Sequence, residues 1–188
     1  MLRLRLAPVL MLGILCTALP ASAQNAVPTF DLSAGYQFTH VPDESLPLGF
    51  AVDAARNWGP LGLVGEIGWA HKSDESSGFD TSLNLWHFGA GPRWSLRRSP
   101  AVTPYVQVLA GVANLRASVE ASGVDISGSD TGFMLQPGGG ISVMAGDGWA
   151  VFGSVDYRRV FLGDDSEVGS GEDENEFRFL FGIRMVLD

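Results

Sequence analysis

Apolar side chains recur at every second position through most of this chain, and this alternation limits the folds that it can adopt. In the first segment, Phe30, Leu32, Ala34, Tyr36 and Phe38 alternate with Asp31, Ser33, Gly35, Gln37 and Thr39. Successive side chains of a β-strand point to opposite faces, so the pattern indicates a strand with one apolar and one mixed face. The same period recurs at 48–55, 61–69, 86–94, 105–112, 133–143, 149–157 and 177–185. The sequence therefore predicts an all-β chain of eight strands.

The connections between these segments alternate between two kinds. Those at 57–60, 97–101 and 145–148 are short and turn-like, whereas 41–46, 73–79, 120–130 and 161–175 are mostly longer and polar. Hairpins of an up-and-down meander open alternately at the two ends of a sheet, which would produce this order. In transmembrane barrels the short turns face the periplasm and the long loops face outside. We therefore expect an eight-stranded antiparallel up-and-down transmembrane β-barrel.

Period two alone does not say which face is inside. A soluble, lipocalin-like barrel places its apolar face inward, and a membrane barrel reverses this. The mixed face carries many glycines, which weaken a water-facing strand but make room in the narrow interior of a small barrel. It also has few of the lysines that normally solubilise an outer surface. Both features favour a membrane barrel with the mixed face inside.

Charged residues of the mixed face are expected to form an ion-pair network inside the barrel. The candidates are Asp31, Asp53, Glu66, Arg93, Asp156, Arg158, Arg178 and Arg184. Buried charges need partners and hydrogen bonds, and arginine can bind a carboxylate through two parallel bonds. We predict a structural role for this network.

Large aromatic residues lie mostly near the ends of the predicted strands. They are Tyr36, Trp69, Trp86, Trp94, Trp149 and Tyr157. Membrane barrels carry aromatic girdles at the two lipid interfaces, so these residues are predicted to be interfacial. Closure of the sheet would satisfy every backbone group in the hydrocarbon layer.

The first residues have the pattern of an export signal. A basic start with Arg3 and Arg5 precedes an apolar stretch, and an Ala-Ser-Ala sequence at 21–23 offers a cleavage site. We predict a cleaved signal peptide over 1–23 and a barrel domain over 24–188. Cleavage would remove Cys16, the one cysteine, and would leave 10 Lys and Arg against 21 Asp and Glu, a net charge of −11. Such an acidic chain is not expected to bind nucleic acid.

Two stretches resemble a known family. Phe88-Gly-Ala-Gly-Pro-Arg-Trp94 and Thr103-Pro-Tyr-Val-Gln-Val-Leu-Ala-Gly-Val112 are similar to the small outer-membrane barrels of bacteria, the OmpA-type, OmpX-like and "porin family" domains. The resemblance covers roughly Val27 to Asp188. It implies location in the outer membrane, contact with its lipid and lipopolysaccharide, and insertion by the barrel-assembly machinery with periplasmic chaperones. It also implies an extracellular ligand bound through the loops.

The sequence offers no catalytic, cofactor or metal site. His40, His71 and His87 show no metal-ligand spacing, and the His-x-Ser-Asn run of outer-membrane deacylases is absent. The acidic residues between 164 and 176 are expected to form a solvated loop. We therefore expect a structural or surface-interaction role, such as membrane integrity, adhesion or binding. Two alternatives are a narrow channel for small solutes and a periplasmic, lipocalin-like carrier of an apolar ligand.

Overall fold

The computed structural model describes residues 28–41, 44–76, 79–96, 101–121, 124–162 and 174–187. The predicted signal peptide and residues 163–173, most of the predicted acidic loop, lie outside the described residues. The strands are β1 (Phe30–Val41), β2 (Glu44–Leu46), β3 (Leu48–Trp58), β4 (Leu61–Ser76), β5 (Phe79–Ser95), β6 (Val102–Ala121), β7 (Val124–Gly146), β8 (Trp149–Phe161) and β9 (Glu174–Leu187). No helix in these ranges is long and apolar enough to cross a membrane.

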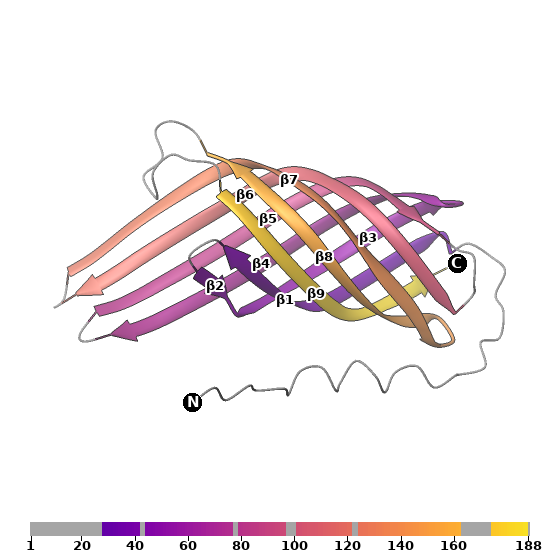
Figure 1. The fold of residues 1–188 in the computed structure, drawn as a ribbon, viewed down its shortest axis with the longest axis horizontal. Helices are drawn as coiled ribbons and strands as arrows, with labels where there is room; N and C mark the ends of the chain where they lie inside the picture. Colours follow the sequence, from indigo (N-terminus) through magenta and orange to yellow (C-terminus); the bar gives the residue numbers. More distant parts are fainter. Residues whose placement is uncertain are drawn as a thin grey trace, which may run out of the picture.

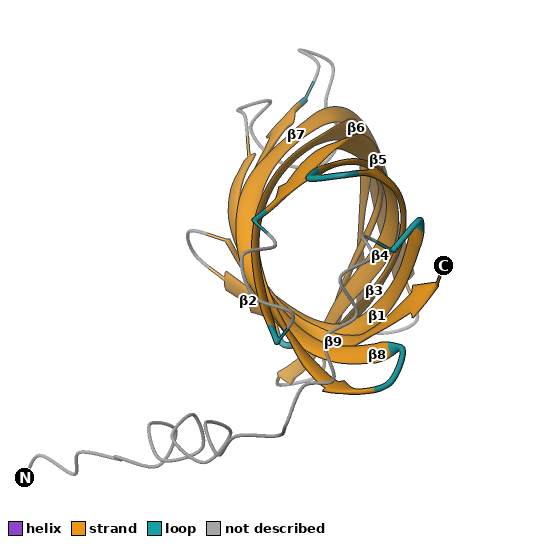
Figure 2. Cartoon of the chain, turned by 90° about the vertical axis from the view of Figure 1, so that its right-hand side faces the viewer, coloured by secondary structure: helices purple, strands orange, loops and turns teal. Residues whose placement is uncertain are grey.

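The sheet closes on itself. Each strand pairs antiparallel with its neighbours, and β1 also pairs with β9 from Phe30↔Leu187 to His40↔Phe177. Strands β2 and β3 follow one another along the same side of the barrel and together count as one of its eight strands. Pro47 separates them because it has no N–H to donate to the ladder. The nine labelled strands therefore make a closed eight-stranded barrel, seen end-on in Figure 2. The predicted fold is confirmed.

Tight turns mark one end of the barrel, called the turn end below. Gly59 and Gly148 adopt φ values of 65° and 78° there, in the left-handed region that favours glycine. The C-terminus lies at the same end (Figure 1). The opposite end, where β4–β5 and β6–β7 turn, is called the loop end.

The structure corrects three of the predicted long loops. Strands β4 and β5 continue through most of 73–79, β6 and β7 through most of 120–130, and β2 occupies 44–46. These stretches were expected to be loops because they are polar. Apolar alternation, however, marks only the part of a strand that meets hydrocarbon, and a polar strand is still held by hydrogen bonds to its neighbours.

The loop end is uneven because two hairpins extend beyond the rest. Pairing between β3 and β4 ends at Leu48↔His71, and pairing between β7 and β8 begins at Phe133↔Phe161. Beyond these points β4, β5, β6 and β7 remain in register up to Ser76↔Phe79 and Ala121↔Val124. We call this four-stranded extension the projecting sheet (Figure 1).

The outside of the barrel is apolar. Exposed large side chains follow every strand except the three-residue β2, for example Phe177, Phe179, Phe181, Ile183, Met185 and Leu187 on β9. This run spans ten residue steps, which is about 33 Å along the strand and about 25 Å along the barrel axis at the usual tilt. Polar outward residues border the belt at the loop end, namely His40, His71, Asn84, Asn114, Thr131, Arg159 and Asn175. The arrangement suits a bilayer and is the reverse of a lipocalin.

A closed ladder predicts resistance to unfolding by detergent. Unboiled protein should run on a denaturing gel as a compact, faster band, because no strand edge in the belt is open to attack. Boiling should shift the band to the position of the unfolded chain. Identical mobility with and without boiling, in protein extracted from membranes by detergent, would contradict a closed membrane barrel.

Candidate functional site

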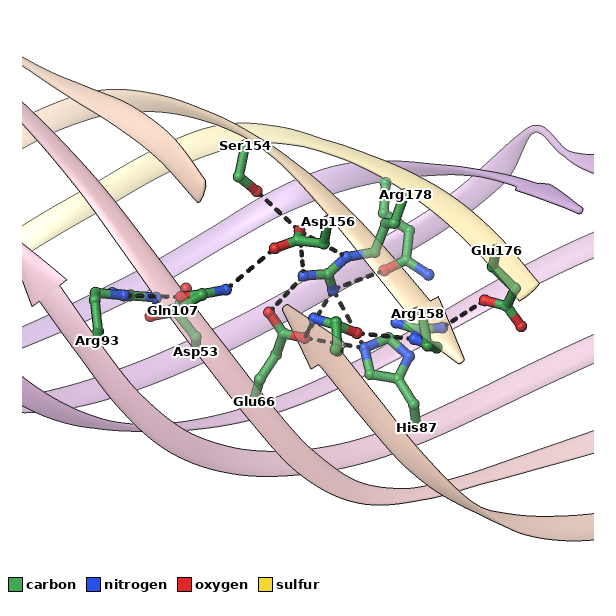
Figure 3. A network of polar contacts seen from close by, with 12 residues as sticks. Asp53, Glu66, His87, Arg93, Gln107, Ser154, Asp156, Arg158, Glu176 and Arg178 are labelled. Atoms are coloured by element: carbon green, nitrogen blue, oxygen red, sulfur yellow. Dashed lines mark hydrogen bonds and ion pairs between the residues drawn. The ribbon is translucent and has the colours of Figure 1, made fainter. Parts of the chain in front are cut away.

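The structure places all eight predicted charged residues inside the barrel. Each is at most 5% exposed. They come from β1, β3, β4, β5, β8 and β9, so residues far apart in the sequence meet across the interior. Figure 3 shows most of them together.

Arg178 lies at the centre of the network. Its Nη1 and Nη2 donate to the two carboxylate oxygens of Glu66 at 2.7 and 2.9 Å. Its Nε and Nη2 also donate to Oδ2 of Asp156 at 3.1 and 2.8 Å. One guanidinium thus joins β4, β8 and β9 through two carboxylates (Figure 3).

One arm of the network runs from Glu66 toward the loop end. Glu66 Oε1 accepts from Gln136 Nε2 and lies beside His87 Nε2, both at 3.2 Å. The amide oxygen of Gln136 in turn accepts from Arg158 Nε at 2.8 Å. Arg158 also donates to Glu176 at 3.0 Å. Gln136 therefore connects two ion pairs that do not touch directly.

A second arm runs from Asp156 toward the turn end. Gln107 donates to Asp156 at 3.4 Å and accepts from Arg93 Nε at 2.9 Å. Arg93 Nη2 lies 3.2 Å from Asp53 Oδ1. Ser33 donates to the same Asp53 oxygen at 3.2 Å and accepts from Arg184 Nε at 2.9 Å.

Aromatic rings support the arginines at the turn end. The guanidinium carbons of Arg93 and Arg184 lie 4.9 and 4.8 Å from the centre of the Tyr105 ring. Arg184 also lies 5.0 Å from the Phe152 ring, and no ion pair joins it to a described carboxylate. Ring quadrupoles attract cations in desolvated sites, so the rings stand in for a counter-charge. Asp31 lies at this end too, and accepts from Asn57 at 2.9 Å.

Several members of the network were missed from the sequence. Glu176 precedes the predicted segment 177–185, although the same alternation places it on the face of Arg178. Gln107 and Gln136 also lie on the mixed face, but no sequence signal shows that their amides bridge separate ion pairs. With Glu176 included, the negative charges of the two arms equal the positive charges of the four interior arginines. The four acids are Asp53, Glu66, Asp156 and Glu176.

Glycines on the inner face make room for the charged groups. A Cβ atom at Gly138 would collide with the carboxylate of Asp156, and one at Gly68 would collide with the ring of His87. The inward glycines noted in the sequence are therefore needed where a large polar side chain crosses the lumen.

The predicted interfacial aromatics point outward. Tyr36, Trp86, Trp94, Trp149 and Tyr157 are exposed on the outer face, and Trp69 is half-buried among neighbouring rings. Trp69 lies 5.8 Å from Phe50 and 6.2 Å from Trp86, between ring centres. Because β4 and β5 continue beyond the barrel, Trp69 and Trp86 lie in mid-strand, at the loop-end border of the apolar belt, rather than near a strand end.

The carboxylates of the network are held by cations. Within the described ranges no three His, Cys, Asp or Glu side chains are placed to hold a metal ion. The carboxylates of the two arms are all engaged by guanidinium groups, which leaves none of them as a free base.

Arg178 is predicted to contribute more to stability than any exposed arginine. Arg178→Ala leaves Glu66 and Asp156 buried without their cation, so we expect a loss of about 3–5 kcal/mol in unfolding free energy. Arg93→Ala should also destabilise, because Asp53 loses its ion pair. Urea unfolding in lipid vesicles measures both. The control is Arg56→Ala, which removes an outward arginine; equal midpoints for Arg178→Ala and Arg56→Ala would contradict the assignment.

The glycine positions give an independent test of interior packing. Gly138→Ala should cost about 1–3 kcal/mol, because its new methyl group overpacks the Asp156 carboxylate. Gly65→Ala is the matched control, since a Cβ there meets nothing within 4 Å. Equal urea midpoints for these two variants would show that Asp156 moves aside without cost.

Comparisons with known proteins agree with the geometry. The chain is similar in structure to Ail, the attachment invasion locus protein of Yersinia pestis, with 19% identity, a TM-score of 0.55, and coverage of 83% of this chain and 96% of that one. It is also similar to Neisserial surface protein A, with 16% identity, a TM-score of 0.61, and coverage of 84% and 96%. At these identities the likeness shows the fold alone. No curated protein sequence matches the chain.

The sequence profile of the outer membrane protein beta-barrel domain matches residues 9–184, nearly the whole chain. A closed antiparallel barrel with an apolar exterior and a charged interior is the architecture expected of such a domain. The chain therefore belongs to the outer membrane β-barrel domain family.

Proposed function

We propose that this outer-membrane barrel is a non-enzymatic protein that interacts with partners at the cell surface through its projecting sheet. A signal peptide over 1–23 would direct its export, and the turn end would face the periplasm. The observation that carries the proposal is the projecting sheet, because barrel closure alone does not require two hairpins to extend beyond the membrane belt.

The interior argues against the channel alternative. The two arms of the network cross the lumen and engage its charged side chains with one another. A conducting path for ions would have to break several buried charge pairs, and each such break is costly. The outward apolar belt argues equally against a soluble carrier, which would hold its ligand among inward apolar side chains.

The outer face of the projecting sheet is polar and in register. Its most regular row crosses all four strands as Ser73↔Ser82↔Ser118↔Ser127. The hydroxyls of Ser82 and Ser118 lie 2.8 Å apart. Such a surface can exchange hydrogen bonds with a partner above the lipid.

Charge indicates the kind of partner. The structure of Ail includes a heparin analogue, sucrose octasulfate, which is a polyanion. This chain has 12 basic and 21 acidic residues, and the stretches 73–82 and 118–127 of the projecting sheet contain five acids and no Lys or Arg. The acids are Asp74, Glu75, Asp80, Glu120 and Asp125. We therefore expect a neutral or cationic partner rather than a sulfated polysaccharide.

Outer-membrane lipid and lipopolysaccharide would contact the belt, and the barrel-assembly machinery with periplasmic chaperones would insert the chain.

Shortening the projecting sheet tests this function. Residues 73–82 and 118–127 would each be replaced by a two-residue Asn-Gly turn, which closes a hairpin without disturbing the barrel below. Cells producing this variant should lose adhesion to polylysine-coated surfaces, while the variant keeps its gel shift on boiling.

The unmodified protein should adhere more strongly to polylysine than to heparin-coated surfaces. Unchanged adhesion by the shortened variant would contradict a role for the projecting sheet. Stronger adhesion of the unmodified protein to heparin would contradict the inferred charge of the partner.

A further inference from the structure

An apolar layer lies inside the barrel at its loop end. It consists of Leu46, Ala70, Leu85, Ala113, Met134 and Val160, with Val41, Leu115 and Leu162 packed against it. The six central members are at most 4% exposed. Sequence alternation did not predict it, because these residues occupy the otherwise mixed inner face.

The apolar layer lies directly on the loop side of the charged network. On β5, β7 and β8 its members Leu85, Met134 and Val160 are the next inward positions after His87, Gln136 and Arg158, respectively. Seven of the eight sides of the barrel contribute to the layer. The eighth, β9, places Glu176 near this level, where Arg158 holds it.

Polar side chains next to the apolar layer are fully buried. Thr39, His87 and Arg158, next to the apolar layer, are 0% exposed. Interior polar residues nearer the turn end range from 1% exposed, at Ser33, to 7% exposed, at Asn57. The polar groups that lie next to the apolar layer are therefore closed to solvent.

We propose that the apolar layer is the permeability seal of the barrel, which closes it to water and ions at the loop end. Apolar constrictions exclude water because they offer it no hydrogen bonds. An ion-pair network alone is a weaker barrier, because its polar atoms can bond to entering water. This role does not depend on the projecting sheet or on any surface partner.

Cysteine labelling tests the seal. In full-length protein with Cys16 replaced by serine, Thr39→Cys places a single thiol beneath the apolar layer. We expect it to react with a small cationic methanethiosulfonate reagent at least tenfold more slowly than a thiol at Ser73→Cys on the exposed outer face. Adding Leu85→Ala should raise the rate at position 39 at least tenfold.

Leu109→Ala is the matched control. Leu109 is also an inward, fully buried leucine, but it packs with Ala55 and Val64 in a separate cluster. Thr39→Cys with Leu109→Ala should stay unreactive, and the gel shift on boiling confirms that each variant is folded. Rapid labelling of Thr39→Cys alone, or equal rates with Leu85→Ala and Leu109→Ala, would overturn the proposal.

Planar-bilayer recording gives a second measurement. The unmodified protein should show no discrete openings, and Leu85→Ser combined with Met134→Ser should give either openings or a raised leak. Reproducible openings of the unmodified protein would overturn the seal but leave the surface interaction untouched. Loss of adhesion on shortening the projecting sheet, by contrast, bears on the surface interaction alone.

Discussion

The guanidinium of Arg178 is the interaction on which the interior of this barrel depends. It binds Glu66 through both of its terminal nitrogens and holds Asp156 at the same time. An unpaired charge inside a barrel surrounded by lipid would be costly, so each of these groups is tolerated only because the others are present. The glutamines then extend this centre in both directions, because an amide can accept from one arginine and donate to a carboxylate of the next pair.

Two solvents shape the rest of the molecule. Along the belt, the outward side chains are apolar because they contact lipid. In the narrow lumen, small residues lie beside large charged ones because space is limited, as at Gly138 opposite Asp156. Beyond the belt both faces of the projecting sheet are free to be polar, and the serine row from Ser73 to Ser127 occupies the outward positions. The same four strands therefore change their side-chain pattern where they leave the membrane, although their backbone ladder continues unbroken.

The fold could be predicted from the sequence because successive side chains of a strand alternate between its faces. The choice of the inward face needed two further signals, the many glycines and the few lysines of the mixed face. The sequence could not show which charges meet. Arg178 and Glu66 are 112 residues apart, and their contact depends on how the sheet closes. Glu176 was missed because the predicted strand began one residue later. The extensions of β4 to β7 were missed because hydrogen bonding, rather than apolar alternation, holds a strand above the membrane.

The apolar layer shows why the mixed face should not be treated as uniformly polar. Leu85 and Met134 occupy inward positions next to His87 and Gln136, and only the closed barrel reveals that they meet one another. Buried polar groups gain strength where water is excluded, since the local dielectric constant falls. By excluding water, the apolar layer would therefore strengthen the ion pairs beneath it. Those ion pairs would in turn hold the strands in the positions at which the residues of the apolar layer meet.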